Sequence, residues 1–169
     1  MNPGTSSGSP ADGPPADESP AAIARGIVDA SLYMVLATAD AAGRPWSSPV
    51  YFAHVECREF FWLSSPEAVH SRNIAVRPQV GIAIFDSSAP IGTGQGVYMP
   101  AIAESVADPG IERAMEVFSR RSLSHGGRAW TAADVDEASG LRLYRAVANE
   151  HSILAKDGQP DHRIPVDLA

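Results

Sequence analysis

The sequence predicts a mainly β fold in which six or seven strands form a closed or split barrel with helices at its periphery. Two observations support this fold class. Short β-rich segments follow one another with turn residues between them, and the 169 residues, 44% hydrophobic and 20% charged, have the composition of one globular domain. Because the strands arrive as consecutive hairpins rather than alternating with helices, a barrel is favoured over a doubly wound sheet.

The first 20 residues are predicted to form a disordered tail. They contain five Pro and three Gly, and none of Val, Ile, Leu, Phe, Trp or Tyr. Such a segment cannot bury enough apolar surface to offset the entropy lost on ordering. We therefore expect a tail over residues 1–20 and one folded domain over residues 21–169.

Helix signals begin where the tail ends. Ser19-Pro20 combines a capping side chain with a proline at the first helical position, which predicts a helix through Leu32. Ser65-Pro66 repeats this pattern and predicts a second helix that ends near Val76.

Two further helices are predicted from apolar spacing and capping. A third helix opens at Asp108-Pro109 and ends at Arg120-Arg121, because apolar residues recur between them at the spacing of one helix face. Thr131 and Asp134 form a capping box for a short fourth helix.

The remaining β-rich segments are predicted to be strands. They cover residues 33–38, 45–55, 59–64, 80–85, 95–103, 141–149 and 152–155. Asp157-Gly158 predicts a final hairpin turn.

Charge and residue counts exclude several classes of partner. The net charge is -7 and no cluster of Lys and Arg occurs, so we expect no nucleic-acid partner. No apolar stretch approaches the roughly 20 residues of a membrane-spanning helix. The histidines lack metal-ligand spacing, and the single cysteine, Cys57, is expected to be an exposed thiol in a turn. We expect a cytoplasmic protein with no membrane contact and no metal site.

Two segments carry candidate binding chemistry. Ser64 and Ser65 lead into a helix that bears Arg72, so hydroxyl groups, a helix N-terminus and a guanidinium converge as in a phosphate site; a solvated helix face is the alternative. In residues 47–50, Pro49 interrupts a strand, which either marks an ordinary edge strand or frees backbone groups to bind a planar heterocycle. The Gly-rich residues 92–96 precede a strand and lack the lysine of a phosphate-binding loop.

A series of short segments connects these candidates to a known family. The segments are Leu36–Asp40, Gly43–Pro45, Ser48–Phe52, Phe60–Ser65, and Arg72–Ile74 ahead of Arg77–Val80. In order and spacing, over roughly residues 25–155, they resemble the pyridoxamine 5'-phosphate oxidase-like, FMN-binding split-barrel superfamily. The resemblance implies a six-stranded antiparallel split barrel. It also implies a homodimer that binds FMN in two grooves between its subunits.

The resemblance assigns roles to individual residues. It implies that the flavin ring and ribityl chain contact Ser47, Ser48, Pro49 and Val50, and that the end of the next strand and the following helix take the phosphate through Trp62, Ser64, Ser65, His70, Ser71 and Arg72. It further implies that Gln95 reaches the flavin from the partner chain and that Arg121 contacts a small-molecule substrate. It identifies no catalytic residue.

The chain also departs from the family pattern. Many members place a lysine on the phosphate where this chain has His70, so we expect phosphate affinity to depend on Arg72 and to weaken as the pH rises past about 6.5. Phe52 stands where true pyridoxamine-phosphate oxidases have a lysine near the substrate. An FMN-dependent oxidoreductase acting on another small molecule is therefore expected. The alternatives are a deazaflavin-dependent reductase and a non-catalytic flavin- or haem-binding protein.

Overall fold

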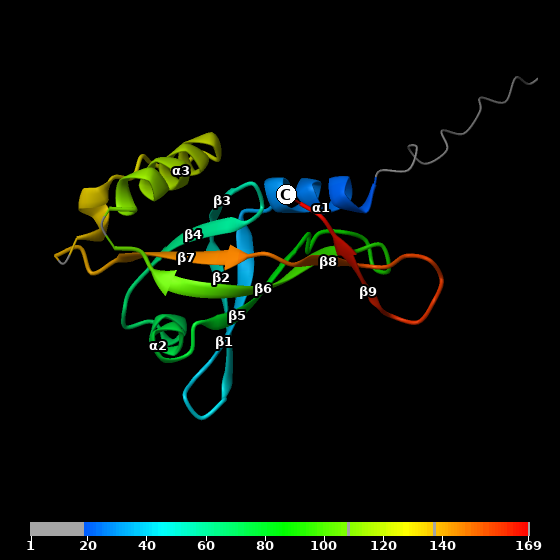
Figure 1. The fold of residues 1–169 in the computed structure, drawn as a ribbon. Coiled ribbons are helices and arrows are strands. Elements are labelled where there is room, and N and C mark those ends of the chain that lie inside the picture. Colours follow the sequence, from blue (N-terminus) through cyan, green and yellow to red (C-terminus); the bar gives the residue numbers. More distant parts are fainter. Residues whose placement is uncertain (1–18, 108, 137, 169) are drawn as a thin grey trace, which may run out of the picture.

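A curled antiparallel sheet with helices at its edges forms the domain (Figure 1). The structure is a computed structural model that describes residues 19–107, 109–136 and 138–168. The predicted tail lies outside these residues except for Ser19 and Pro20, which begin the first helix. The mainly β class predicted from the sequence is confirmed, and the curled antiparallel sheet is consistent with a split barrel.

The elements occur in the following order along the chain. They are α1 (Pro20–Ala30), β1 (Tyr33–Ala39), β2 (Pro45–Tyr51), β3 (Ala53–Val55), β4 (Glu59–Ser64), α2 (Val69–Val76), β5 (Gln79–Phe85), β6 (Gly96–Ser105), α3 (Ile111–Ser124), the 3₁₀ helix η1 (Ala132–Val135), β7 (Arg142–Ala148), β8 (His151–Leu154) and β9 (Arg163–Val166).

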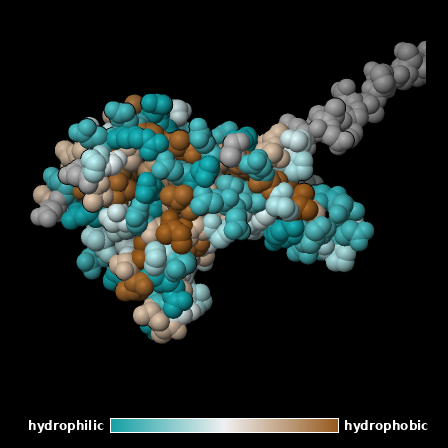
Figure 2. Space-filling model, viewed as in Figure 1, coloured by the Kyte–Doolittle hydropathy of each residue, from teal (hydrophilic) through white to brown (hydrophobic). Residues whose placement is uncertain are grey.

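The strand order in the sheet is β2-β1-β5-β6-β7-β4-β3, and β8 pairs with both β6 and β9. The β8–β9 hairpin contains the predicted Asp157-Gly158 turn and projects to the right in Figure 1. Figure 2 shows this projecting arm as mostly hydrophilic, whereas hydrophobic residues gather along the middle of the same view.

The described residues contain nine strands, more than the six or seven expected. One cause is a break at Phe52, where the predicted strand 45–55 divides into β2 and β3. The Phe52 side chain is fully buried, and its backbone N–H donates to the Leu32 carbonyl oxygen instead of to a neighbouring strand.

Capping chemistry was predicted correctly at two helix starts and wrongly at a third. The Ser19 hydroxyl accepts from Ala22 N at 3.2 Å, and the capping box at Thr131 is present. By contrast, α2 begins at Val69, because the Ser65 hydroxyl accepts from Glu67 N at 3.2 Å and closes a separate turn.

The third helix also differs from its prediction at both ends. It begins at Ile111 after Gly110 and continues past Arg121 to Ser124. Asp108, at which it was expected to open, lies outside the described residues.

Two hydrophobic clusters hold the fold together. The larger fills the barrel and includes Phe60 and Trp62, and the smaller lies between α3 and the opposite face of the sheet and includes Phe61 and Phe118. Alternate residues of β4 thus serve the two clusters, as the pleat requires. No helix in the described part of the chain has the length and apolar character needed to cross a membrane.

The expectation of an exposed Cys57 was wrong. Glu56 and Cys57 have φ values of 52° and 54°, which gives the β3–β4 turn the backbone that suits the twist of a hairpin. This turn points the cysteine inward, where it is 3% exposed and belongs to the barrel core. Burial raises the pKa of its thiol, so Cys57 is a core residue.

Candidate functional site

The barrel is split between β2 and β4. Strand β2 ends the sheet on one side, and β3 covers β4 only over residues 59–61. The end of β4 therefore approaches β2 without a ladder between them in the described residues. Pro49 lies on this edge of β2, where its missing N–H leaves no ladder bond unmade.

His70 bridges this split. Its Nδ1 lies 3.1 Å from Ser48 Oγ on β2, and its Nε2 lies 2.8 Å from Ser64 Oγ on β4. The Trp46 indole N–H donates to the same Ser48 oxygen at 3.0 Å. We call Trp46, Ser48, Ser64 and His70 the seam cluster. It joins β2, α2 and β4 through side chains where backbone pairing is missing.

Helix α2 is held over the split by buried polar contacts. Asn73 Nδ2 donates to Thr38 Oγ1 on β1 at 3.0 Å, and the Thr38 hydroxyl donates to the Trp46 carbonyl oxygen at 3.3 Å. Ile74 packs into the barrel core. These contacts fix the helix that carries His70.

The surroundings of His70 disfavour its charged form. The side chain is buried, and burial lowers the pKa of the imidazole below its usual value of 6.5. Both ring nitrogens are already engaged by Ser48 and Ser64.

A cavity of about 560 Å³ adjoins the seam cluster. It is lined mainly by apolar and aromatic side chains, together with a few polar ones from distant parts of the chain. The lining residues are Leu32, Tyr33, Pro49, Val50, Tyr51, Leu63, Ser64, His70, Phe118, Ser122, His125, Gly127, Trp130 and Leu141. Its size and character are typical of a small-molecule site.

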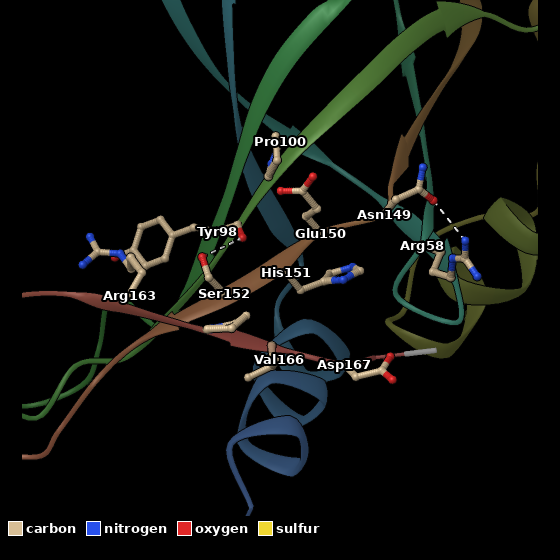
Figure 3. A pocket seen from close by; sticks show the side chains of 11 residues that line it. Arg58, Tyr98, Pro100, Asn149, Glu150, His151, Ser152, Arg163, Val166 and Asp167 are labelled. Carbon is tan, nitrogen blue, oxygen red and sulfur yellow. Dashed lines mark hydrogen bonds between the residues drawn. The ribbon is translucent and has the colours of Figure 1, made fainter.

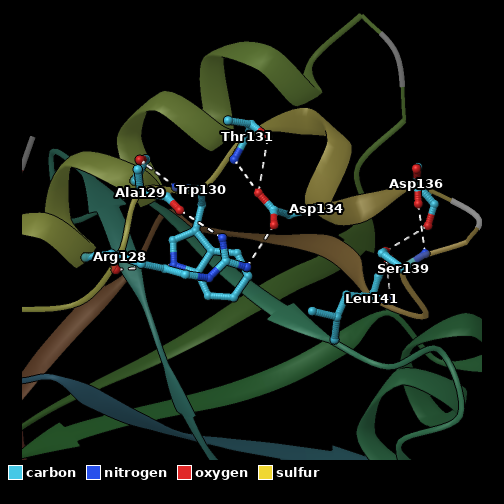
Figure 4. Close-up of polar contacts among 10 residues, drawn as sticks. Arg128, Ala129, Trp130, Thr131, Asp134, Asp136, Ser139 and Leu141 are labelled. Atoms are coloured by element: carbon cyan, nitrogen blue, oxygen red, sulfur yellow. Dashed lines mark hydrogen bonds and ion pairs between the residues drawn. The ribbon is translucent and has the colours of Figure 1, made fainter.

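The loop after α3 supplies one wall of this cavity. The Trp130 indole N–H donates to Ser122 Oγ at 3.2 Å. The Arg128 guanidinium stacks on the indole ring at 3.5 Å, as Figure 4 shows. A Cβ at Gly127 would lie 2.4 Å from Ser122 Oγ, so only glycine allows the loop to pass this close to α3. Arg128 also pairs with Asp134, which lowers the pKa of that carboxyl to about 2.

Five of the predicted site residues are brought together here. Ser48 and Ser64 are each hydrogen-bonded to His70, and Pro49 and Val50 line the adjoining cavity.

Other predicted residues lie close to the seam cluster in sequence without lining the cavity. Ser47 is exposed on β2, and Ser65 closes its turn. Ser71 is buried on α2, and its hydroxyl has no partner among the described residues. Arg72 is exposed, and its partner among the described residues is Glu67 in the turn before α2, whose carbonyl oxygen accepts from its guanidinium.

Three other predicted residues are absent from the cavity lining and contact other parts of the fold. Trp62 is fully buried and stacks on Tyr144 in the barrel core. The Gln95 amide holds β8 by accepting from Leu154 N at 3.0 Å and donating to Leu154 O at 2.7 Å.

Arg121 is the third of these residues, and it binds the end of α1. Its Nη2 donates to the carbonyl oxygens of Val28, Asp29 and Ser31, and its guanidinium lies 5.0 Å from the centre of the Phe52 ring. We call this arrangement the helix clamp. A cation there complements the negative end of the helix dipole.

No sequence pattern indicated the aromatic wall. Tyr51, Phe118 and Trp130 lie far apart in the chain, and each reads as an ordinary core residue. The Tyr51 hydroxyl is buried with no hydrogen-bond partner among the described residues, and burial raises the pKa of its phenol. This unpaired polar atom is the feature that a search for a ligand site would notice, and only the structure reveals it.

A larger cavity of about 740 Å³ lies on another part of the sheet, between β6, β8 and β9 (Figure 3). Its two arginines have partners: Arg58 donates to Asn149 Oδ1 at 3.0 Å, and Arg163 stacks on Tyr98 at 4.2 Å. None of the predicted site residues lines it.

Comparisons with known proteins agree with this geometry. A family model described as pyridoxamine 5'-phosphate oxidase matches residues 22–149. The chain belongs to this family. The match includes α1, the whole seam cluster and most of the sheet of this pyridoxamine 5'-phosphate oxidase family member. No curated protein sequence matches it.

Solved structures share the fold at low sequence identity. A haem-binding protein from Mycobacterium smegmatis is 21% identical with a TM-score of 0.68; the match covers 88% of this chain and 59% of that one. The haem storage protein HutZ from Vibrio cholerae is 23% identical with a TM-score of 0.57, covering 74% and 87%. An F420 reductase is 16% identical with a TM-score of 0.57, covering 76% and 95%. The chain thus spans 59% of the length of the M. smegmatis protein.

Proposed function

We propose that this protein is an FMN-dependent oxidoreductase that acts on a small molecule, with the cofactor bound beside the seam cluster. The observation that carries the proposal is the placement of that cluster, at the split of a barrel of this family and on the wall of an aromatic cavity. Bound FMN would supply hydride or electron transfer.

The residues present suit a flavin. Tyr33, Tyr51, Phe118 and Trp130 offer flat apolar surface for a planar ring system. The unpaired Tyr51 hydroxyl is a polar group in this lining without a protein partner among the described residues. The protein's part is to hold the ring in place and to exclude water around it.

A phosphate group would be held at the end of β4 and on α2. Ser64 and Ser65 contribute hydroxyl groups, and Arg72 contributes a guanidinium two residues after His70. Because Arg72 is exposed and bound only to its own helix start, it can turn toward a ligand without breaking the core. We assign the phosphate charge to Arg72 and not to His70.

We further propose that the protein is a homodimer whose cofactor groove includes both copies. The outer face of β1, β5 and β6 is apolar, with Val35, Ala37, Gly81, Ala83 and Pro100 along a shallow depression of about 410 Å³. An antiparallel sheet facing water carries polar residues on that face, so this composition favours cover by another protein surface. A second copy of the chain is the proposed cover.

Purification tests the cofactor assignment. The full chain is expected to be yellow, to release FMN on denaturation and to rebind added FMN with quenching of its fluorescence. A colourless protein that binds deazaflavin and not FMN would overturn the assignment in favour of a deazaflavin-dependent reductase.

The dimer has a separate test. Ala83→Arg places a charge on the apolar face and is expected to convert a dimer into a monomer in analytical ultracentrifugation, with FMN affinity reduced at least tenfold. A wild-type monomer that binds FMN normally would contradict the shared groove.

Haem binding is the second candidate, and His125 supports it. His125 Nδ1 lies 2.9 Å from the Arg121 carbonyl oxygen, which can only accept, so this nitrogen carries the proton and Nε2 has a free lone pair. Histidines that ligate metals are commonly oriented by such a bond to a carbonyl. Haemin titration tests this candidate: a Soret band that His125→Ala abolishes would support it, and the absence of a band would exclude it.

A further inference from the structure

Two histidine side chains hold the β3–β4 turn, one on each backbone group of Cys57. The Cys57 N–H donates to His54 Nδ1 at 3.4 Å, and the Cys57 carbonyl oxygen lies 2.6 Å from His151 Nε2. Figure 3 shows the His151 ring pointing from β8 toward this turn. Glu56 and Cys57 both have positive φ values, which residues with a side chain rarely adopt, so bonds from outside the turn help to hold its backbone.

The two bonds respond differently to a proton. A carbonyl oxygen can only accept, so His151 donates from Nε2 whether its ring is neutral or charged. A backbone N–H can only donate, so His54 accepts at Nδ1. A charged imidazole carries a proton on both nitrogens. The His54 bond to Cys57 therefore requires a neutral ring, whereas the His151 bond does not.

The surroundings of His54 favour this neutral ring. Its side chain is 11% exposed and packs beside the rings of Phe52 and Phe60. Burial and the charge of Arg121 lower the pKa of the His54 imidazole below its usual value of 6.5. The Asp29 carboxylate, 3.1 Å from His54 Nε2 at the end of α1, opposes this shift without reversing it.

Further charged groups surround the turn. They are Arg25 on α1, Glu56 and Arg58 in the turn, and Asp167, which lines the same cavity as His151. Histidine is the side chain whose ordinary pKa puts its change of charge between about pH 5 and pH 8. Burial raises the pKa of the Cys57 thiol, so this thiol stays neutral in mild acid. A change of charge at the turn in mild acid therefore falls on a histidine.

We propose that His54 and Cys57 form a pH-sensitive latch, which holds the β3–β4 turn closed at neutral pH and opens when His54 takes up a proton. Protonation at Nδ1 sets two N–H groups against each other and leaves the Cys57 N–H without an acceptor. That N–H can bond to water only if the turn moves outward, and the thiol of the chain's single cysteine then becomes accessible. The latch does not depend on FMN.

The proton balance sets the size of the expected effect. The closed turn excludes a proton from His54 Nδ1, whereas an imidazole released to water has a pKa of about 6.5. Each pH unit below about 6.5 therefore favours the open turn by up to about tenfold. Above this pH, opening should be independent of pH.

The latch is tested in the full chain by the rate at which 4,4'-dithiodipyridine labels Cys57, the single cysteine. The labelling rate of the chain unfolded in urea, divided by the rate of the native chain at the same pH, gives the protection of the thiol. This protection is expected to fall at least tenfold between about pH 7.5 and about pH 5. Protection that stays constant over this range would overturn the proposal.

Two substitutions distinguish the two histidines. Asn has an amide oxygen that can accept in place of Nδ1 and does not titrate, so His54→Asn is expected to keep its protection within about threefold at both pH values. Gln has an amide N–H that can donate in place of Nε2, so His151→Gln is the matched control and should retain the wild-type fall with pH. A wild-type fall in His54→Asn would overturn the proposal.

Hydrogen exchange of the wild-type chain separates local opening from global unfolding without any variant. At about pH 5 the Cys57 amide is expected to be at least tenfold less protected than the amide of Met99, which lies in the barrel core. Equal protection of the two amides would mean that Cys57 is exposed only when the whole chain unfolds, and the latch would be refuted.

Discussion

The seam cluster and the helix clamp are built alike, but their polar groups bind different partners. In each, one nitrogen-rich side chain joins elements that the backbone leaves unconnected: His70 joins β2 to β4, and Arg121 joins α3 to the end of α1. The clamp uses a cation whose Nη2 donates to three carbonyl oxygens, while its buried Nε has no hydrogen-bond partner among the described residues. The seam cluster uses a buried imidazole that links two serine hydroxyls beside a cavity.

The partners explain this difference. Carbonyl oxygens at a helix C-terminus only accept and carry partial negative charge, so a guanidinium with several donors suits them. Serine hydroxyls both donate and accept, so an imidazole can link two of them without a net charge. Ser64 and His70 of the seam cluster line the cavity, whereas Arg121 does not.

The largest effect is expected from breaking the clamp. Arg121→Ala leaves three carbonyl oxygens without their donor and should lower the free energy of unfolding by about 3 kcal/mol, measured by urea denaturation. The exposed Arg120, changed to Ala, is the control and should stay within about 0.5 kcal/mol. An Arg121→Ala protein of normal stability with weakened substrate binding would show instead that Arg121 serves the ligand.

The opposite result is expected for Arg72. Arg72→Ala should lower FMN affinity at least tenfold, about 1.4 kcal/mol, because it removes the cation assigned to the phosphate. Stability should hardly change, since Arg72 bonds only within its own helix start. Fluorescence titration and urea denaturation of the same sample measure both quantities. Unchanged affinity would refute the phosphate assignment.

Gln95 tests whether a neutral side chain stabilises the fold or binds the cofactor. Gln95→Ala removes the amide that mimics a ladder partner for Leu154, so we expect the free energy of unfolding to fall by about 1 kcal/mol. Hydrogen exchange at the Leu154 amide should accelerate. If stability is unaffected while FMN affinity falls, Gln95 belongs to the cofactor groove of the partner, as the family resemblance implies.

The smallest effect concerns pH. Burial lowers the pKa of His70 and of His54 in the folded state, so the unfolded chain takes up protons first as the pH falls below about 6.5. The free energy of unfolding should therefore be highest above this pH and decline as the pH decreases toward the folded-state pKa values. His70→Gln should flatten this decline in urea denaturation series. A decline of equal slope would assign the effect to His54 or to other groups.

Local patterns predicted the elements well and their exact ends less well. The β-rich segments became strands, and the Thr131 capping box is present, because each signal acts within a few residues. The helix start predicted at Ser65-Pro66 was wrong, because a serine side chain can either cap a helix or close a turn. Which of the two forms depends on where α2 lies over β1.

Local patterns could not predict which way a side chain faces or which residues it contacts. The sequence placed Trp62 beside Ser64 in a binding segment, but strand pleating turns Trp62 into the barrel core. Arg72 and Arg121 are chemically identical in the sequence. Only their neighbours in space distinguish an exposed cation from one bound to three carbonyl oxygens.

The sequence was enough to predict the mainly β class and to bring Ser48, Ser64 and His70 into one predicted region, because these depend on local patterns and on their order along the chain. The burial of His70, the aromatic wall of the cavity and the carbonyl partners of Arg121 are seen only in the tertiary structure. These three properties depend on burial and on partners distant in sequence. No short segment of the sequence encodes burial or distant partners, so these properties arise only when the barrel folds.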